Sequence, residues 1–335
     1  MRVAILAHEK FPDDAKTAVG ILRYGDYEVV GILDRDHPGE AVRDHLPDVQ
    51  DAPIFERMTE VPRCDALVVG VAPIGGGFDE TWRDDVRTAI ERGCDVIAGL
   101  HYFLSEDEEF ATLAAEHDVE LRDVRRPPDD LTVADGTAGD VDARIVLTVG
   151  TDCSSGKMTS SFELRDAARE RGLDAAVAPT GQTGIMIAGW GIAIDRVISD
   201  FAAGATERLV EEVGEKDVIF VEGQGALVHP AYSGVTTSIL HGAQPYALVL
   251  CHIAGRGQFG GYERFDLPDL RTYIQLYENM SAPISGATVD AGMVNTHGMP
   301  VDAADDAIDE FAAAIDAPAT DPVRYDVDDV LDALL

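Results

Sequence analysis

Short apolar runs alternate with amphipathic stretches along the chain, and this alternation predicts its secondary structure. The first part has apolar runs at residues 3–7, 29–33, 66–71 and 95–99 and a helix-like segment at residues 79–93. The second part has apolar runs at residues 143–149, 174–178, 217–222, 246–252 and 284–289, each followed by a turn and a helix-compatible stretch. Strands that alternate with helices are typical of a parallel sheet with helices on both faces. The pattern therefore predicts an α/β fold.

Residues 124–142 interrupt this pattern. Their sequence, VRRPPDDLTVADGTAGDVD, is rich in Pro, Asp and Gly and lacks apolar periodicity, which is typical of a linker or an exposed crossover. At 335 residues the chain is also long for a single core. We therefore expect two domains, at residues 1–135 and 136–335, of which the first is a Rossmann-like parallel-sheet domain.

A glycine-rich turn follows the first strand of the second half and reads GTDCSSGKMT at residues 150–159. Main-chain N–H groups of such a turn point inward, the next helix presents its positive N-terminal end, and a lysine adds an ammonium charge. The alternative is a simple strand-to-helix turn with one exposed lysine. The pattern favours a phosphate-binding loop, or P-loop, and a P-loop NTPase-like second domain. Its expected ligand-binding residues are Gly150, Thr151, Asp152, Cys153, Ser154, Ser155, Gly156, Lys157 and Thr159.

The loop departs from the usual pattern at two places. Five residues, rather than four, separate its first glycine from the Gly-Lys pair, and Met158 stands where a magnesium-binding Ser or Thr is expected. Thr159 or Ser160 would therefore have to supply that hydroxyl. The departure fits a loop that binds phosphate without cleaving it.

Glu222 is the candidate metal ligand of the second domain, because it ends an apolar strand and precedes Gly-Gln-Gly. A carboxylate at that position can lie beside a phosphate loop and hold Mg²⁺ directly or through water. A helix cap or turn residue is the alternative. We expect Glu222, together with Thr159, to bind Mg²⁺ if a metal is present.

The composition is strongly acidic, with 62 Asp and Glu against 26 Lys and Arg and a formal net charge of -36. Such a surface repels itself at low ionic strength, whereas in molar salt the Debye length falls to about 3 Å and the repulsion is screened. The composition therefore predicts a halophilic host. A disordered chain is excluded because 46% of the residues are hydrophobic.

The same composition limits the partners and the location. No basic stripe is present for nucleic acid, and no apolar stretch approaches the roughly 20 residues of a membrane-spanning helix. The four cysteines form no CxxC pair, and no signal-like segment starts the chain, so we expect a reducing, cytoplasmic location. We expect a small-molecule substrate and a homo-oligomer, because high salt strengthens apolar association.

The first domain gives weaker signals. Asp34 ends the second apolar run, where a dinucleotide fold would hold a ribose, but the first run leads into His-Glu-Lys-Phe-Pro without GxGxxG. Nicotinamide binding is therefore poorly supported. The turn at residues 72–77 and the segment at residues 99–104 follow strands, where α/β sheets bind ligands, although simple turn chemistry explains them equally well.

Longer motifs resemble two known groups of proteins. GTDCSSGK together with VEGQG looks like the P-loop of dethiobiotin synthetase. The fuller resemblance adds GTDCSSGKMTSSFEL, APTGQTGIMIAGWGIAIDRVISDFAAGA, VEGQGALVHPAYSGVT and ATDPVR, and is to the D-glutamate N-acetyltransferase family. That resemblance implies transfer of acetyl from acetyl-CoA to the amino group of D-glutamate, with the P-loop holding the pyrophosphate of CoA or of a nucleotide.

The resemblance and the residue chemistry together suggest roles for residues outside the loop. His229 is the candidate general base, acting with Lys157 in catalysis, because an imidazole can take a proton from a substrate ammonium. Gln182 and Thr183 lie in a polar turn that could reach the substrate. His252 and Arg256 could meet its carboxylates.

Three functions remain open from the sequence. The first is direct attack of the amine on the thioester, with an acyl-enzyme on Cys153 as its variant. The second is an ATP- and Mg²⁺-dependent ligase or kinase like dethiobiotin synthetase, with ATP in place of acetyl-CoA. The third is a non-catalytic, nucleotide-binding switch.

Overall fold

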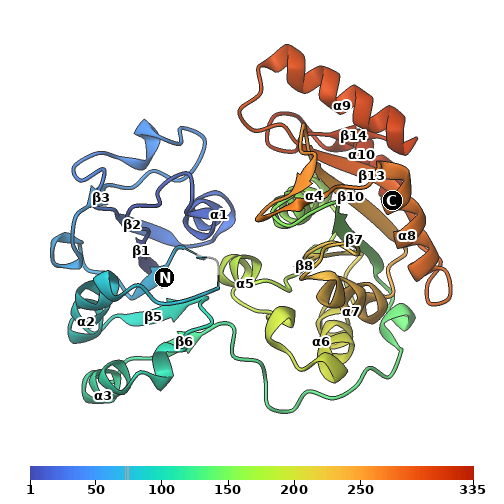
Figure 1. Cartoon of the computed structure of the whole chain (residues 1–335). Helices are drawn as coiled ribbons and strands as arrows, with labels where there is room; N and C mark the ends of the chain where they lie inside the picture. The colour runs from blue at the N-terminus through green and yellow to red at the C-terminus, as the bar shows by residue number, and fades with distance from the viewer. Residues whose placement is uncertain (72, 74) are drawn as a thin grey trace. The chain divides into compact units, whose positions relative to one another are not determined.

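The computed structural model describes residues 1–71, 73 and 75–335, and the chain forms two compact units. The first unit comprises Met1–Pro127 and Gln182–Ala193, and the second comprises Pro128–Gly181 and Ile194–Leu335. Each unit has its own six-stranded sheet (Figure 1), which confirms the predicted α/β fold. The joint between Pro127 and Pro128 lies inside the segment that reads as a linker. Part of the turn predicted at residues 72–77 falls on residues 72 and 74, outside the described residues.

The sheet of the first unit is entirely parallel and has the strand order β3-β2-β1-β4-β5-β6. This is the order of a Rossmann fold, whose ligand crevice lies where the order reverses, beside β1 and β4. The two edge strands, β3 and β6, are short and were not predicted. The bounds are β1 Arg2–Leu6, β2 Glu28–Leu33, β3 Ile54–Phe55, β4 Ala66–Val69, β5 Asp95–Ala98 and β6 Leu121–Asp123.

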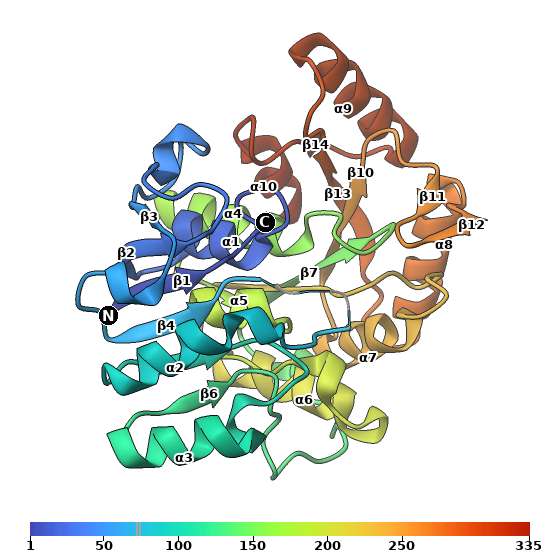
Figure 2. The same ribbon diagram turned by 60° about the vertical axis from the view of Figure 1, so that its left-hand side comes forward.

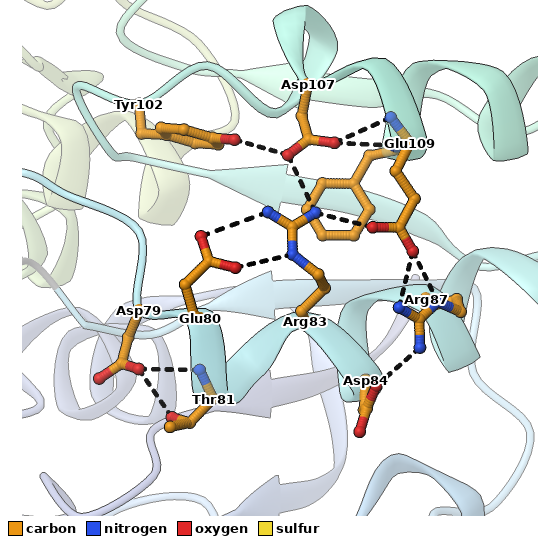
Figure 3. A network of polar contacts seen from close by, with 10 residues as sticks. Asp79, Glu80, Thr81, Arg83, Asp84, Arg87, Tyr102, Asp107 and Glu109 are labelled. Carbon is orange, nitrogen blue, oxygen red and sulfur yellow. Dashed lines mark hydrogen bonds and ion pairs between the residues drawn. The ribbon is translucent and has the colours of Figure 1, made fainter.

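Helices α2 and α3 of the first unit pack against each other and are joined by ion pairs (Figures 2 and 3). Arg83 on α2 donates hydrogen bonds to Asp107 and Glu109, at 3.0 and 2.9 Å, and Arg87 reaches Glu109 as well. The helix predicted at residues 79–93 is a 3₁₀ turn, Glu80–Trp82, followed by α2. The helices are α1 Lys16–Tyr24, α2 Arg83–Glu91, α3 Glu108–His117 and α5 Gln182–Ala188, with further 3₁₀ turns at Val42–Asp44, Met58–Glu60 and Leu104–Glu106.

Helix α5 belongs to the first unit although the second half of the sequence encodes it. The hydroxyls of Thr17, on α1, and Thr183, on α5, lie 2.8 Å apart, and the Tyr27 hydroxyl donates to the Met186 carbonyl at 2.8 Å. A Cβ atom on Gly99 would lie 2.9 Å from the Gln182 side chain, so the glycine permits this close packing. No pattern in the sequence predicts this excursion of the chain.

The sheet of the second unit is also parallel, with the order β14-β13-β10-β7-β9-β8. The strand predicted at residues 284–289 was placed wrongly, because β13 begins at Thr288. Residues before it form a turn, in which the exposed Ile284 donates its N–H to the Ser281 carbonyl and Gly286 has a φ of +73°. The bounds are β7 Arg144–Gly150, β8 Ala175–Ala178, β9 Val218–Val221, β10 Ala247–Ile253, β13 Thr288–Asn295 and β14 Ala319–Thr320.

Helices cover both faces of this sheet. Helix α4 packs on β7, β8 and β9 and contacts α10, while α6, α7 and α8 pack in sequence on the other side (Figure 1). A small antiparallel hairpin, β11 Gln258–Phe259 with β12 Tyr262–Asp266, follows β10 (Figure 2). The helices are α4 Lys157–Glu170, α6 Ser199–Glu212, α7 Ser233–Ala243, α8 Leu270–Ser281, α9 Val301–Ile315 and α10 Asp328–Leu334, with 3₁₀ turns at Ala138–Asp140 and Ile194–Arg196.

The part of the linker that enters the second unit is anchored to α6. The carboxylate of Glu207 accepts hydrogen bonds from the backbone N–H groups of Asp135, Gly136 and Thr137 at 2.7 to 2.8 Å. Across the described residues, no helix is long and apolar enough to cross a membrane.

Candidate phosphate-binding site

The candidate site is formed at the carboxyl end of β7, which lies between β9 and β10 in the sheet. The strand ends at Gly150, the loop turns through Ser154 and Gly156, and α4 begins at Lys157. Ser154 and Gly156 have φ angles of +55° and +97°, so the chain turns sharply through the left-handed region there. The N-terminal end of α4 therefore adjoins the loop, and the positive end of the helix dipole favours an anion there.

The ammonium group of Lys157 lies inside the loop. Its side chain is buried, and Nζ donates to the Asp152 carbonyl at 2.8 Å and to the Ser155 hydroxyl at 3.2 Å. Gly223 lies against its stem, since an added Cβ would come within 3.3 Å of the Lys157 Cδ atom and 1.8 Å of the Thr148 carbonyl oxygen. A side chain at position 223 would thus collide with the strand that carries the loop.

Two tyrosines of α8 donate hydrogen bonds to the backbone of the loop, and neither was predicted from the sequence. The Tyr273 hydroxyl donates to the Thr151 carbonyl at 2.7 Å, and the Tyr277 hydroxyl donates to the Gly150 carbonyl at 2.8 Å. Burial raises the pKa of both phenols, which keeps them neutral hydrogen-bond donors. Their spacing of four residues, which places them on one face of a helix, is the signal that could have identified them.

Asp152 is completely buried and joins the loop to the β11–β12 hairpin and to the turn before it. Its Oδ2 atom accepts hydrogen bonds from Arg256 Nη1 and from the Gly260 N–H, both at 2.9 Å, and Oδ1 accepts from the Cys153 N–H at 2.7 Å. These donors stabilise the ionised carboxylate. The guanidinium of Arg256, predicted to bind substrate carboxylates, is therefore already bonded to a carboxylate of the protein.

His229 lies beside Asp152 in an aromatic environment. Its ring is buried and is surrounded by Tyr232, Phe259 and Tyr262, with centroid distances of 4.8 to 5.2 Å. Burial is the main cause that lowers the pKa of His229, the charge of Lys157 lowers it further, and the nearby Asp152 opposes both. The ring is therefore held in its neutral form.

The hydrogen bonds of His229 decide what the neutral ring can do. Nδ1 accepts the Ala231 N–H at 3.1 Å, so the ring proton resides on Nε2. Nε2 lies 3.6 Å from Asp152 Oδ1, is buried, and has no hydrogen-bond partner among the described residues. This geometry argues against the predicted role of general base, because the only free ring atom is a donor.

His252 is neutral for a similar reason. Its Nδ1 atom lies 2.9 Å from the Thr151 hydroxyl, and its ring stacks on Phe311 with an interplanar angle of 2°. Burial, with a smaller effect of the Arg256 charge, lowers the pKa of His252 to about 4. The ring is therefore held in its neutral form, and contact of His252 with substrate carboxylates stays a prediction.

Glu222 follows β9 and is buried. Its Oε2 atom accepts the N–H groups of Thr180 and Gly181, both at 3.2 Å. Magnesium binding by Glu222 and Thr159 stays a prediction. Two neighbours of Thr159 are less suited to hold Mg²⁺. Met158 has no hydroxyl and is buried, and the Ser160 hydroxyl already accepts a hydrogen bond from the Cys251 thiol at 3.5 Å.

Known proteins resemble this chain in both halves. Residues 35–127 match the Rossmann-like domain, and residues 132–331 the P-loop domain, of DUF1611, a domain of unknown function. The chain belongs to the DUF1611 family.

Two relatives have names that state an enzymatic activity. D-glutamate N-acetyltransferases of Pseudoalteromonas sp. and Tritonibacter scottomollicae are 37% and 35% identical over 267 and 269 residues, which cover 79% and 80% of this chain and 80% of each relative. A crystal structure at 2.30 Å resolution of a DUF1611 family protein from Anabaena variabilis is 37% identical, with a TM-score of 0.94 over 99% of this chain and 98% of that one. The resemblance inferred from the motifs and the prediction of an enzyme are confirmed.

Within the DUF1611 fold, the predicted site residues fall into two groups. The second unit brings the P-loop together with Glu222, His229, His252 and Arg256, as described above. The predicted substrate residues Gln182 and Thr183 belong to the first unit, where they pack against Gly99 and Thr17. Their role in substrate binding stays a prediction.

One further group lies at the tip of the P-loop. Asp152, Cys153 and His229 each place one polar atom within 4.8 Å of the others. Cys153 is half-buried, and its role as an acyl-enzyme nucleophile stays a prediction.

Proposed function

We propose that this protein transfers the acetyl group of acetyl-CoA to the amino group of D-glutamate, and that the P-loop binds phosphates of the donor. The observation that carries the proposal is the 37% identity, over 79% of the chain, to a protein named D-glutamate N-acetyltransferase. The loop geometry supports the part of the proposal that concerns the donor. The buried Lys157 side chain and the positive N-terminal end of α4 lie together at the loop, and both favour an anion.

The residue after the lysine favours binding over hydrolysis. A P-loop that cleaves a nucleotide uses the Ser or Thr after its lysine to hold Mg²⁺. Here that residue is the buried Met158. CoA carries a pyrophosphate and needs no metal to be held by backbone N–H groups and an ammonium, so it suits this loop.

The reaction that we propose is direct transfer. The deprotonated amine of D-glutamate attacks the thioester carbonyl, a C–N bond forms and the C–S bond breaks. The proton of the original ammonium is released, and CoA leaves as a thiol after taking up a proton. The Nε2–H group of His229 is a buried donor beside the loop, suited to an oxygen of the bound donor. His229 thus orients or stabilises oxygen instead of removing the proton.

Calorimetric titration and a product assay test the donor and the acceptor separately. In molar KCl, we expect acetyl-CoA to bind the wild type and to bind Lys157→Ala far more weakly. The matched control is Lys216→Ala, since Lys216 lies in the same unit and pairs only with an exposed Asp174 among the described residues. Mass spectrometry should detect N-acetylated D-glutamate and much less product from L-glutamate.

Other outcomes would overturn the proposal. Binding of Mg-ATP without acetyl-CoA, with release of ADP, would support the ligase or kinase. Nucleotide binding without turnover of any amino acid would support the switch. A Cys153→Ala protein should keep most of its activity, and its inactivity would replace direct transfer with an acyl-enzyme.

A further inference from the structure

A second cluster of chemically active side chains lies in the first unit, in the loop that follows β2. We call His37, Glu40 and His45 the His37 cluster. One ring nitrogen of each histidine and one carboxylate oxygen all lie within 4.8 Å of one another. The two rings meet edge to face with their centroids 4.4 Å apart. The loop leaves β2 at the carboxyl edge of the sheet, the edge at which Rossmann folds bind ligands.

A buried carboxylate orients the first histidine. Asp34 is completely buried at the end of β2, and its Oδ2 atom lies 2.6 Å from His37 Nδ1. Its other oxygen, Oδ1, accepts the Glu9 N–H at 2.6 Å, which prevents the carboxylate from turning away. In the neutral ring, a proton on Nδ1 leaves the lone pair of Nε2 free for a metal ion. A carboxylate that holds the second nitrogen of a histidine is the usual support of a metal-binding imidazole.

The second histidine is held as well. His45 Nε2 lies 2.7 Å from Glu40 Oε2, and the ring packs edge-on against Phe11. The side chains of His37, Glu40 and His45 are 29%, 49% and 17% exposed, so an ion can reach the cluster from solvent. The alternative is two separate ion pairs, His37 with Asp34 and His45 with Glu40. That alternative does not explain why both rings and the Glu40 carboxylate converge on one point.

We propose that the His37 cluster binds one divalent transition-metal ion, with zinc as the first choice. Two imidazole nitrogens and one carboxylate oxygen form a frequent zinc ligand set, whereas Mg²⁺ and Ca²⁺ prefer oxygen ligands alone. Tetrahedral zinc, with bonds of about 2.0 to 2.1 Å, places its ligand atoms about 3.3 Å apart. The candidate ligand atoms lie within 4.8 Å of one another, so the side chains would have to rotate toward the ion. The fourth position is left for water or a small anion.

The ion would fix the crossover between β2 and β3. All three ligands lie within nine residues of this loop, and Asp34 connects them to the sheet. The inference uses contacts of the first unit alone, so it does not depend on acetyl transfer or on the P-loop.

Metal binding is measured on the full chain after treatment with EDTA, in molar KCl, which screens weak binding to the many surface carboxylates. Zn²⁺ is followed by calorimetry and Co²⁺ by its visible absorption. We expect one tight site, with affinity at least 100-fold lower in His37→Ala and His45→Ala. Asp34→Asn should lower the affinity by about 10- to 100-fold, because it removes the support of His37.

Three variants make the result decisive. Glu40→Gln changes an exposed side chain, so it should fold normally and still weaken binding. His117→Ala, at the exposed end of α3, should bind metal like the wild type. Cys153→Ser tests the other candidate group, Asp152, Cys153 and His229. The proposal fails if no saturable site is found, if His37→Ala and Glu40→Gln bind as the wild type does, or if Cys153→Ser alone abolishes binding.

Discussion

The two units share an architecture but differ in what they place at the carboxyl edge of the sheet. In the second unit, β7 runs into a glycine-containing loop that offers N–H groups and the buried Lys157. In the first unit, β1 and β2 lead to histidines and carboxylates, including Asp34 and His37. The first set of groups favours an anion, whereas the second is the ligand set that we propose for a cation. The difference teaches that the turn after a strand, rather than the sheet, determines the ligand class.

The units also differ in how their edges are supported. The hydroxyls of Tyr273 and Tyr277 hold the P-loop through neutral hydrogen bonds to its backbone carbonyls. Charged pairs connect α2 and α3 in the first unit, where Arg83 binds several carboxylates at once (Figure 3). Salt should therefore weaken the charged contact between α2 and α3.

The largest effect is expected from Lys157→Ala. Removing a buried cation that pairs with phosphate costs about 3 kcal/mol, or roughly 100-fold in kcat/KM for acetyl transfer. Steady-state kinetics with acetyl-CoA and D-glutamate measures it, with Lys216→Ala as the control. If both variants lost activity equally, the P-loop would not be the donor site.

Gly223→Ala should destabilise the second unit by about 3 kcal/mol, because the new Cβ would overlap the Thr148 carbonyl. Hydrogen exchange should show faster opening of β7 and β9 but unchanged protection of β1 and β4. Gly257→Ala, where an added Cβ meets open space, is the control. Equal loss of protection in both sheets would mean that the two units unfold together.

Acid should destabilise the protein through His252. Its folded-state pKa of about 4 is lower than the usual 6.5, so the unfolded chain binds more protons between these values. Stability is unaffected by this group above pH 6.5 and falls as the pH drops toward 4, by up to about 3 kcal/mol. His252→Asn lacks this loss, so the free-energy difference between the two proteins should change between pH 7.5 and 4.5. A constant difference would show that the fold does not hold His252 as a neutral ring.

Tyr277→Phe should lower the free energy of unfolding by about 1 kcal/mol, since it removes the donor to the Gly150 carbonyl. Donor affinity should fall as the loop loses its support, which calorimetry with acetyl-CoA would show. Tyr246→Phe changes an exposed tyrosine and should alter neither quantity.

The smallest effect is expected from Arg83→Met, which keeps the apolar stem but removes the ion pairs of Figure 3. We expect a loss of about 0.5 to 1 kcal/mol at low salt and less in molar KCl. Thermal unfolding at both salt concentrations measures it. A loss that grows with salt would contradict the assignment of this network to charge pairing.

Local patterns predicted the strands and the loop, because a buried strand needs an apolar run and a phosphate turn needs glycine at fixed positions. The sequence did not predict the edge strand β3, since two residues carry no periodicity. The roles of the histidines depend on distant or backbone partners. Phe311 on α9 stacks on His252 of β10, and the Ala231 N–H sets the proton position of His229. Residue type alone therefore could not give the proton positions of these rings.

The excursion of α5 makes the polypeptide cross between its two units three times, after Pro127, after Gly181 and after Ala193. A gene split near codon 135 would therefore not yield two complete folding units. The first fragment would lack α5, which packs on α1. The second fragment would contain α5 without the unit against which its apolar side chains pack. Fission of this gene during evolution would need a compensating rearrangement, so the two halves are expected to be inherited together.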